Sequence, residues 1–122
     1  MKTRLFVIIK QEGNFLLIRE SNPKWKNKWY LPGGNINEGE RLPDAAIRET
    51  KEESGYDVAL NGICFIKFYN SKHPQRGMHI FYSGRIISGS LKKEADENSI
   101  EADWFDMLKL ETLETRNDLY LP

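Results

Sequence analysis

A short helix with a crowded acidic face is the feature that most constrains this chain. Pro43 suits the first turn of a helix and Gly55 suits the position just past its end, so the sequence predicts a helix over 43–54. Three glutamates stand at i, i+3 and i+4 within it: Glu49, Glu52 and Glu53. These spacings place their carboxylates on one side of the helix, where like charges repel. The pattern indicates that a positive group that is not part of the sequence lies against this face.

Short apolar runs rich in β-forming residues predict strands on both sides of the helix. The first two, 4–10 and 14–20, flank the turn-like residues 11–13 and are expected to pair as a hairpin of buried strands. Later segments predict two long strands, a short last strand and a C-terminal helix: 56–69, 78–87, 102–105 and 107–115. This order predicts an α+β fold, a mixed β-sheet with helices on its faces.

Composition limits the function classes. With 122 residues we expect one domain over 1–122, and the formal net charge of zero gives no overall field that would attract nucleic acid. The apolar run LFVII near the N-terminus is too short for a membrane span or a signal segment. The single cysteine, Cys64, excludes an intramolecular disulfide and is expected to be buried in the run ICFI. We therefore expect a cytoplasmic protein with no nucleic-acid or membrane partner, and the oligomeric state stays open.

The segment before the helix, 21–40, is long and irregular for so small a domain. Its aromatic residues favour a functional loop over disorder. Trp25 and Tyr30 are candidates for stacking on a base, whereas Trp29 is expected to anchor the core. Two cations of this region are candidates for phosphate contacts: Arg19 and Lys28. For each of the two, an ordinary surface cation is the alternative.

Carboxylate oxygens that converge beside a glycine turn are suitable ligands for a hard divalent cation such as Mg²⁺ or Mn²⁺. Magnesium in proteins usually keeps several waters and bridges to substrate phosphates. Arg48 stands four residues before Glu52, so the two are expected to pair and hold that carboxylate in place. The pattern therefore favours metal-assisted cleavage of a phosphate ester or anhydride. A charged helix exposed to solvent is the alternative.

Residues 34–56 resemble the signature of the Nudix hydrolases. That signature has a glycine, five residues, a glutamate, seven residues and then Arg-Glu-aliphatic-x-Glu-Glu-x-Gly-aliphatic. Its seven fixed positions are filled here by Gly34, Glu40, Arg48, Glu49, Glu52, Glu53 and Gly55. Thr50 and Tyr56 depart from it, since both stand where the signature has an aliphatic side chain. Because these two are packing positions, the departures affect local packing more than chemistry.

The resemblance implies a Nudix-like α/β/α sandwich in which the signature forms a loop-helix-loop metal site. The implied ligands of Mg²⁺ (or Mn²⁺) are the side chains of Glu49, Glu52 and Glu53 and the backbone carbonyl of Gly33 or Gly34. The resemblance also implies that Arg48 orients a carboxylate, and that Glu40 is an outer ligand or a structural support. Gly55 has the structural role of ending the helix.

The residue that activates water stays open. The resemblance allows Glu49 or an acid from a later loop, where four acids compete: Glu94, Asp96, Glu97 and Glu101. We favour Glu97, because it precedes Trp104 in the loop that is expected to close over the metal. A solvent-exposed loop acid without a catalytic role is the alternative for Glu97.

The family hydrolyses nucleoside diphosphates linked to a further moiety, so the resemblance implies a Mg²⁺-dependent pyrophosphohydrolase with a nucleotide-derived substrate. The short chain looks more like the small, MutT-like members that act on nucleoside triphosphates. An ADP-ribose or nucleotide-sugar pyrophosphatase is the alternative, and Pro74 stands near the place of a proline found in members acting on ADP-ribose. A Nudix module that binds a nucleotide without cleaving it is a further alternative.

Overall fold

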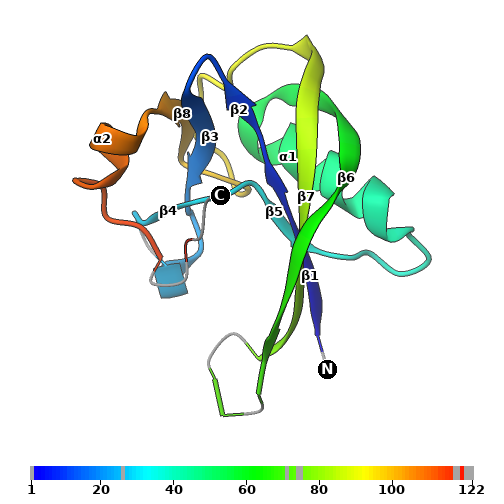
Figure 1. Cartoon of the computed structure of the whole chain (residues 1–122). Helices are drawn as coiled ribbons and strands as arrows, with labels where there is room; N and C mark the ends of the chain where they lie inside the picture. Colours follow the sequence, from blue (N-terminus) through cyan, green and yellow to red (C-terminus); the bar gives the residue numbers. More distant parts are fainter. Residues whose placement is uncertain (1, 26, 71, 74–75, 117–118, 120–122) are drawn as a thin grey trace.

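The computed structural model describes residues 2–25, 27–70, 72–73, 76–116 and 119 (Figure 1). Pro74 lies outside the described residues. The elements are β1 (Thr3–Ile8), β2 (Lys10–Gln11), β3 (Asn14–Arg19), the 3-10 turn η1 (Pro23–Trp25), β4 (Trp29–Tyr30), β5 (Gly33–Asn35), α1 (Leu42–Ser54), β6 (Tyr56–Tyr69), β7 (Gly77–Gly89), β8 (Glu101–Phe105) and α2 (Met107–Leu110). No helix in these ranges is long and apolar enough to cross a membrane.

The strands form two four-stranded sheets, which lie side by side in Figure 1. The first has the order β5-β1-β7-β6 and is mixed, because β1 runs parallel to β7 while its other pairs are antiparallel. The second has the order β2-β3-β4, with β8 also paired to β3, and is antiparallel. The expected α+β class with mixed strand directions is confirmed.

The expected hairpin between 4–10 and 14–20 forms only at its tip, and the expected pairing of its two main strands is wrong. β1 and β3 belong to different sheets, and only the two residues of β2 pair with β3, beside a hydrogen bond from the Leu16 N–H to the Ile9 carbonyl. The reason is that β1 is buried on both faces, with Leu5 and Val7 in one core cluster and Phe6 in the other. A strand buried on both faces is a central strand, and its partners come from distant parts of the chain.

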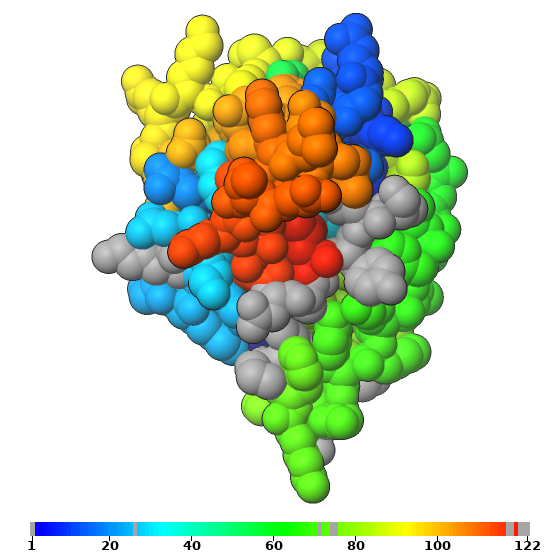
Figure 2. All heavy atoms as spheres, turned by 60° about the vertical axis from the view of Figure 1, so that its left-hand side comes forward, coloured from blue at the N-terminus to red at the C-terminus, as the bar shows by residue number. Residues whose placement is uncertain are grey.

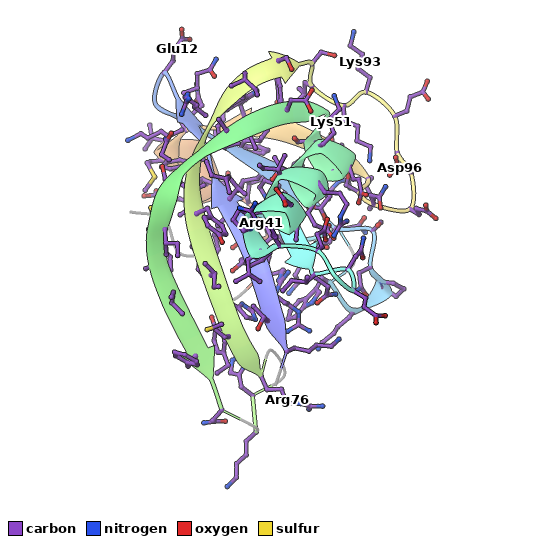
Figure 3. All side chains as sticks on the ribbon, turned by 90° about the vertical axis from the view of Figure 1, so that its right-hand side faces the viewer. Glu12, Arg41, Lys51, Arg76, Lys93 and Asp96 are labelled. Atoms are coloured by element: carbon purple, nitrogen blue, oxygen red, sulfur yellow. The ribbon has the colours of Figure 1, made fainter. Side chains whose placement is uncertain are left out.

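Helix α1 covers one face of the mixed sheet, as Figure 3 shows from the helix side. Ala45 and Ala46 are fully buried there against Leu5, Val7 and Val58. Small side chains let the helix approach the sheet closely, so its acidic face is held close to the backbone of β5. The second sheet covers the opposite face of the mixed sheet, and α2 flanks that second sheet.

The second core cluster lies between the two sheets. Trp29 is buried in it and meets Phe105 edge to face, with ring centroids 4.7 Å apart, so its expected role as a core anchor is confirmed. The irregular segment 21–40 does contain two short strands, β4 and β5, which apolar patterning did not indicate because β5 consists of Gly33, Gly34 and Asn35.

Two smaller expectations are also wrong. Cys64 is exposed, because β6 is the edge strand of the mixed sheet and nothing within the described ranges covers its outer face at this point. Ile63 beside it is 55% exposed for the same reason. The C-terminal helix ends at Leu110 and not at residue 115, one turn after Asp106, whose side chain accepts the Lys109 N–H at 2.8 Å.

Candidate active site

Helix α1 begins and ends as its flanking residues predict. Its first turn holds Pro43, and it ends at Gly55, whose φ of 89° lies in the left-handed region and whose N–H donates to the Lys51 carbonyl at 3.0 Å. The adjoining backbone of Ser90 and Lys92 leaves no room for a Cβ at this glycine. The helix therefore stops directly after Glu53 and Ser54, so the acidic face lies at its C-terminal half.

Arg48 supplies positive charge to the acidic face. Its guanidinium donates to both carboxylate oxygens of Glu40, at 2.8 and 3.0 Å, and to Glu49 at 3.1 Å. The expected pair with Glu52 is present at 3.2 Å, and a further donor reaches the Asn35 carbonyl at 3.0 Å. The hydrogen bonds from Arg48 lower the pKa of Glu40, while those carboxylates raise the pKa of Arg48. One side chain thus fixes the orientation of three glutamates.

Glu53 points from the helix toward the glycine turn of β5. It is only 7% exposed, and one of its oxygens accepts the Gly33 N–H at 2.7 Å. Burial raises the pKa of Glu53 well above its ordinary range, the Gly33 hydrogen bond opposes that shift, and the nearby Glu49 carboxylate adds to it. A buried carboxylate with a raised pKa is a group that a cation would stabilise in its charged form.

Glu49 lies against Gly34. A Cβ at this position would stand 2.9 Å from Oε2 of Glu49, so only glycine allows the carboxylate so close to the turn. Burial raises the pKa of Glu49, and Arg48 opposes this shift. The absence of a side chain at Gly34 therefore lets the Glu49 carboxylate and the backbone oxygens of the turn approach one another.

A cavity of about 600 Å³ opens beside this group, a size common for small-molecule sites. Six of the residues singled out from the sequence line it: Trp25, Gly33, Gly34, Glu49, Glu53 and Glu97. They come from η1, β5, α1 and the loop between β7 and β8. Parts of the chain far apart in sequence therefore bring an aromatic ring, a glycine turn and three carboxylates to one cavity.

Other candidate residues lie elsewhere. Tyr30 is fully buried, with its ring 5.0 Å from that of Phe6, so the expected contact with a substrate does not fit its position. Arg19 is paired with Glu101 at 2.8 Å. Neither Arg19 nor Lys28 lines the cavity.

The carboxylates fit a hard divalent cation in their chemistry, since oxygen donors from side chains and a glycine turn meet at the cavity. Within the described ranges no three acidic, His or Cys side chains are grouped tightly enough to hold a metal ion as they stand. The Glu52 carboxylate binds Arg48 and does not line the cavity. Glu49 and Glu53 are the two helix carboxylates that do.

The sequence reading missed several cavity residues. Lys2, Arg4 and Phe6 line it at alternate positions of β1 and the residue before it, a spacing that is visible in the sequence once the strand is known. Arg116 also lines it, paired with Glu20 at 3.2 Å and lying over the rings of Tyr30 and Trp25 at 4.1 and 4.6 Å.

No local sequence pattern indicates that Arg116 is a cavity residue. It reaches the cavity because its segment runs beside β4. Its N–H donates to the Trp29 carbonyl, and Thr115 forms a bridge with Trp29. Figure 2 shows the C-terminal segment, in orange and red, beside the cyan residues of the segment that precedes β5.

Comparison with known proteins agrees with this geometry. The chain is 32% identical to the 8-oxo-dGDP phosphatase of Homo sapiens over 110 residues, which are 88% of this chain and 33% of that protein. It is 32% identical to the ADP-ribose pyrophosphatase of Methanocaldococcus jannaschii over 108 residues, 87% of this chain and 62% of that protein. The chain spans about a third of the length of the first curated relatives it matches.

Among solved structures, a NUDIX hydrolase from Nitrosomonas europaea matches with a TM-score of 0.84 at 21% identity, covering 96% of this chain and 81% of that chain. This likeness confirms the expected Nudix-like sandwich. The NUDIX domain family itself matches residues 1–121. Members of that family generally use divalent metals. The chain thus belongs to the Nudix hydrolase family.

Proposed function

We propose that this chain hydrolyses a phosphoanhydride bond in a nucleoside diphosphate linked to another moiety, with Mg²⁺ or Mn²⁺ as cofactor. A nucleoside triphosphate is the substrate class we favour, and ADP-ribose or a nucleotide sugar is the alternative. The observation that carries the proposal is the cavity in which Glu49, Glu53, the glycine turn and Glu97 meet beside the Trp25 ring.

The residues that would hold the metal are Glu49 and Glu53, with the backbone carbonyl of Gly33 or Gly34. Glu52 is the third carboxylate of the set, and its side chain is 37% exposed beside Arg48. A divalent cation held there neutralises phosphate charge and makes water a stronger nucleophile at neutral pH. Because Arg48 binds Glu40, Glu49 and Glu52 together, the carboxylates keep their orientation in the absence of substrate.

Glu97 is the base that we favour. Of the four loop acids considered, Asp96 is paired with Lys92, Glu101 is paired with Arg19, and Glu94 does not line the cavity, whereas Glu97 does. In the proposed step, water oxygen bonds to phosphorus and the bridging P–O bond breaks. The water proton passes to the Glu97 carboxylate, and the leaving phosphate group departs as an anion. Glu49, which also lines the cavity, is the alternative base.

Trp25 is the residue that we assign to the base of the nucleotide. Its ring lines the cavity and is backed by the Arg116 guanidinium. Any nucleobase can stack on an aromatic ring, so Trp25 would favour nucleotides as a class without selecting one particular base. The printed activities of the two relatives, on 8-oxo-dGDP and on ADP-ribose, support a nucleotide-derived substrate.

The test is release of phosphate or pyrophosphate by the purified protein with Mg²⁺. The panel holds nucleoside triphosphates, oxidised nucleotides, ADP-ribose, nucleotide sugars and dinucleoside polyphosphates. The Glu53→Gln and Glu12→Gln variants are run beside the parent, since Glu12 lies in the exposed turn after β2, remote from α1 (Figure 3).

We expect turnover of one class, unchanged in Glu12→Gln and reduced by a factor on the order of 100 or more in Glu53→Gln. If the purified protein binds the metal but turns over no member of the panel, the proposal is contradicted. If the parent and the Glu53→Gln variant then bind one of these nucleotides equally well, the protein is the non-catalytic module.

A further inference from the structure

The loop between β7 and β8, residues 90–100, is docked on the C-terminal end of α1. The last carbonyls of a helix have no partner within it. Here three of them are bound by this loop: the Ser54 carbonyl by the Lys92 N–H at 2.8 Å, the Glu52 carbonyl by the Lys92 ammonium at 3.1 Å, and the Glu53 carbonyl by the Ser99 hydroxyl at 2.8 Å. The loop that carries Glu97 thus rests on the backbone of the glutamates we assign to the metal.

Lys92 is the centre of this contact. Its side chain is only 10% exposed, and an ammonium group has three donors. Three acceptors surround it: the Glu52 carbonyl, the Asp96 carboxylate and the Ser99 hydroxyl. A cation at the C-terminal end of a helix is also favoured by the helix dipole. Lys92 is therefore fully bonded, and it holds helix and loop together.

The same contact shapes the turn that presents Glu97. The Asp96 carboxylate accepts the N–H groups of Asn98 at 2.8 Å and Ser99 at 3.3 Å, and the Asp96 N–H donates to the Ser99 carbonyl at 3.0 Å. Glu97 and Asn98, the two residues at this turn, line the cavity. On the other side the Ser21 hydroxyl donates to the Glu97 carbonyl at 2.8 Å.

We propose that Lys92 is a positioning residue that fixes Glu97 relative to the carboxylates of α1. This rests on the proposed function, in which Glu97 takes the proton of the attacking water. Glu53 contributes its carboxylate to the proposed metal site and its carbonyl to the loop, so one piece of backbone sets both positions. A displacement of about 1 Å in a reacting group lowers rates by a factor on the order of 100, so the contact matters for turnover.

The neighbouring lysine provides a matched control. Lys93 is exposed, and in Figure 3 its side chain extends away from the protein, whereas Asp96 lies in the loop near the end of α1. The sequence alone does not separate these two adjacent lysines. Lys93→Met therefore makes the same chemical change without touching the contact.

The experiment compares the parent with Lys92→Met, Lys93→Met, Glu97→Gln and the double variant Lys92→Met/Glu97→Gln. We expect Lys92→Met to lower kcat by roughly 10- to 100-fold, with KM and the Kd for Mn²⁺ changed by less than about threefold. Lys93→Met should match the parent. The double variant should be no slower than Glu97→Gln, because Lys92 acts through Glu97.

Amide hydrogen exchange gives a second readout, which needs no turnover. The N–H groups of Asn98 and Ser99, both bound by Asp96, should exchange faster in Lys92→Met than in Lys93→Met. If Lys92→Met does not fold, Ser99→Ala replaces it, since it removes one ammonium acceptor and the bond to the Glu53 carbonyl.

Any of the following results would overturn the proposal: a normal kcat in Lys92→Met, losses that multiply in the double variant, or equal exchange in the two lysine variants. Full activity in Glu97→Gln would overturn it as well, while leaving the hydrolase itself intact. If the parent turns over nothing, the proposed function fails, and the exchange rates alone then decide whether Lys92 holds the loop.

Discussion

Replacement of Glu53 by Gln should stabilise the metal-free protein and at the same time remove its response to metal. Burial raises the folded-state pKa of Glu53 well above the ordinary value of 4.5, so the folded state holds this proton more tightly than the unfolded chain. The free energy of unfolding of the metal-free protein therefore falls as the pH rises from about 4.5 through the folded pKa. In Glu53→Gln the amide oxygen still accepts the Gly33 N–H, and no charge is buried.

A lower bound on the magnitude is the cost of a buried polar group that is poorly matched, about 1–3 kcal/mol, since the cost is larger for a charged group. For a domain of this size 1 kcal/mol shifts Tm by roughly 4 °C, so the variant should melt at least roughly 4–12 °C higher than the parent in EDTA at pH 8. The difference should shrink as the pH falls toward 4.5, because the folded parent keeps the Glu53 proton more readily than the unfolded chain does. Mg²⁺ at about 100 times its Kd should stabilise the parent by about 2.7 kcal/mol, and the variant hardly at all.

Thermal unfolding measured in EDTA and in Mg²⁺, at pH 5 and pH 8, tests this with Glu12→Gln as the control. The advantage of the variant in EDTA at pH 8 should shrink by about 2.7 kcal/mol, or reverse, when Mg²⁺ is present at about 100 times its Kd. A variant that is less stable than the parent in EDTA at pH 8, or one that gains as much from Mg²⁺, would refute the reasoning.

Three further predictions concern the same cavity. Trp25→Ala should raise KM by roughly 5- to 100-fold through lost stacking and leave kcat within a few-fold, as steady-state kinetics would show; a fall in kcat at constant KM would speak against a role in binding the base. Gly34→Ala should weaken Mn²⁺ binding in titration calorimetry, because the new Cβ would stand 2.9 Å from Oε2 of Glu49, and an unchanged Kd would show that the turn does not serve the metal. Because burial raises the pKa of Glu49, a proton competes with the metal there, so the Kd for Mn²⁺ should increase as the pH falls toward that pKa; affinity independent of pH between 5 and 8 would contradict this.

The sequence was informative where neighbours along the chain decide the structure. Helix α1 runs from Leu42 to Ser54, close to the range set by Pro43 and Gly55, because these two residues act within one turn of the helix ends. The pair of Arg48 with Glu52 follows from the same local geometry.

Partner choice among strands is not local, and here the sequence reading failed. The runs before and after 11–13 looked like a hairpin because they are adjacent, yet β1 pairs with β5 and β7. The burial of β1 on both faces decided its pairing. The residue pattern of one strand does not say which distant strands will cover its faces or pair with it. Cys64 shows the opposite outcome. Its apolar run suggested burial, but the run lies on an edge strand and Cys64 is exposed.

The candidate site divides in the same way. The signature residues of α1 and β5 were found because their spacing is fixed, whereas Arg116 and Lys92 reach the site through contacts between distant segments. Tyr30 shows the limit of a composition argument, since an aromatic residue in a functional loop turned out to belong to the core.

The central claim is that the carboxylates of α1 serve a metal-dependent hydrolysis. Its most direct test is the initial rate of phosphate and pyrophosphate release from the best substrate of the panel, measured in Mg²⁺, in EDTA and after Mg²⁺ is restored, for the parent and for folded Glu53→Gln. We predict turnover by the parent that stops in EDTA and returns with Mg²⁺, and loss of turnover in the variant under all three conditions. Turnover that persists in EDTA, or a variant as fast as the parent, would contradict the claim.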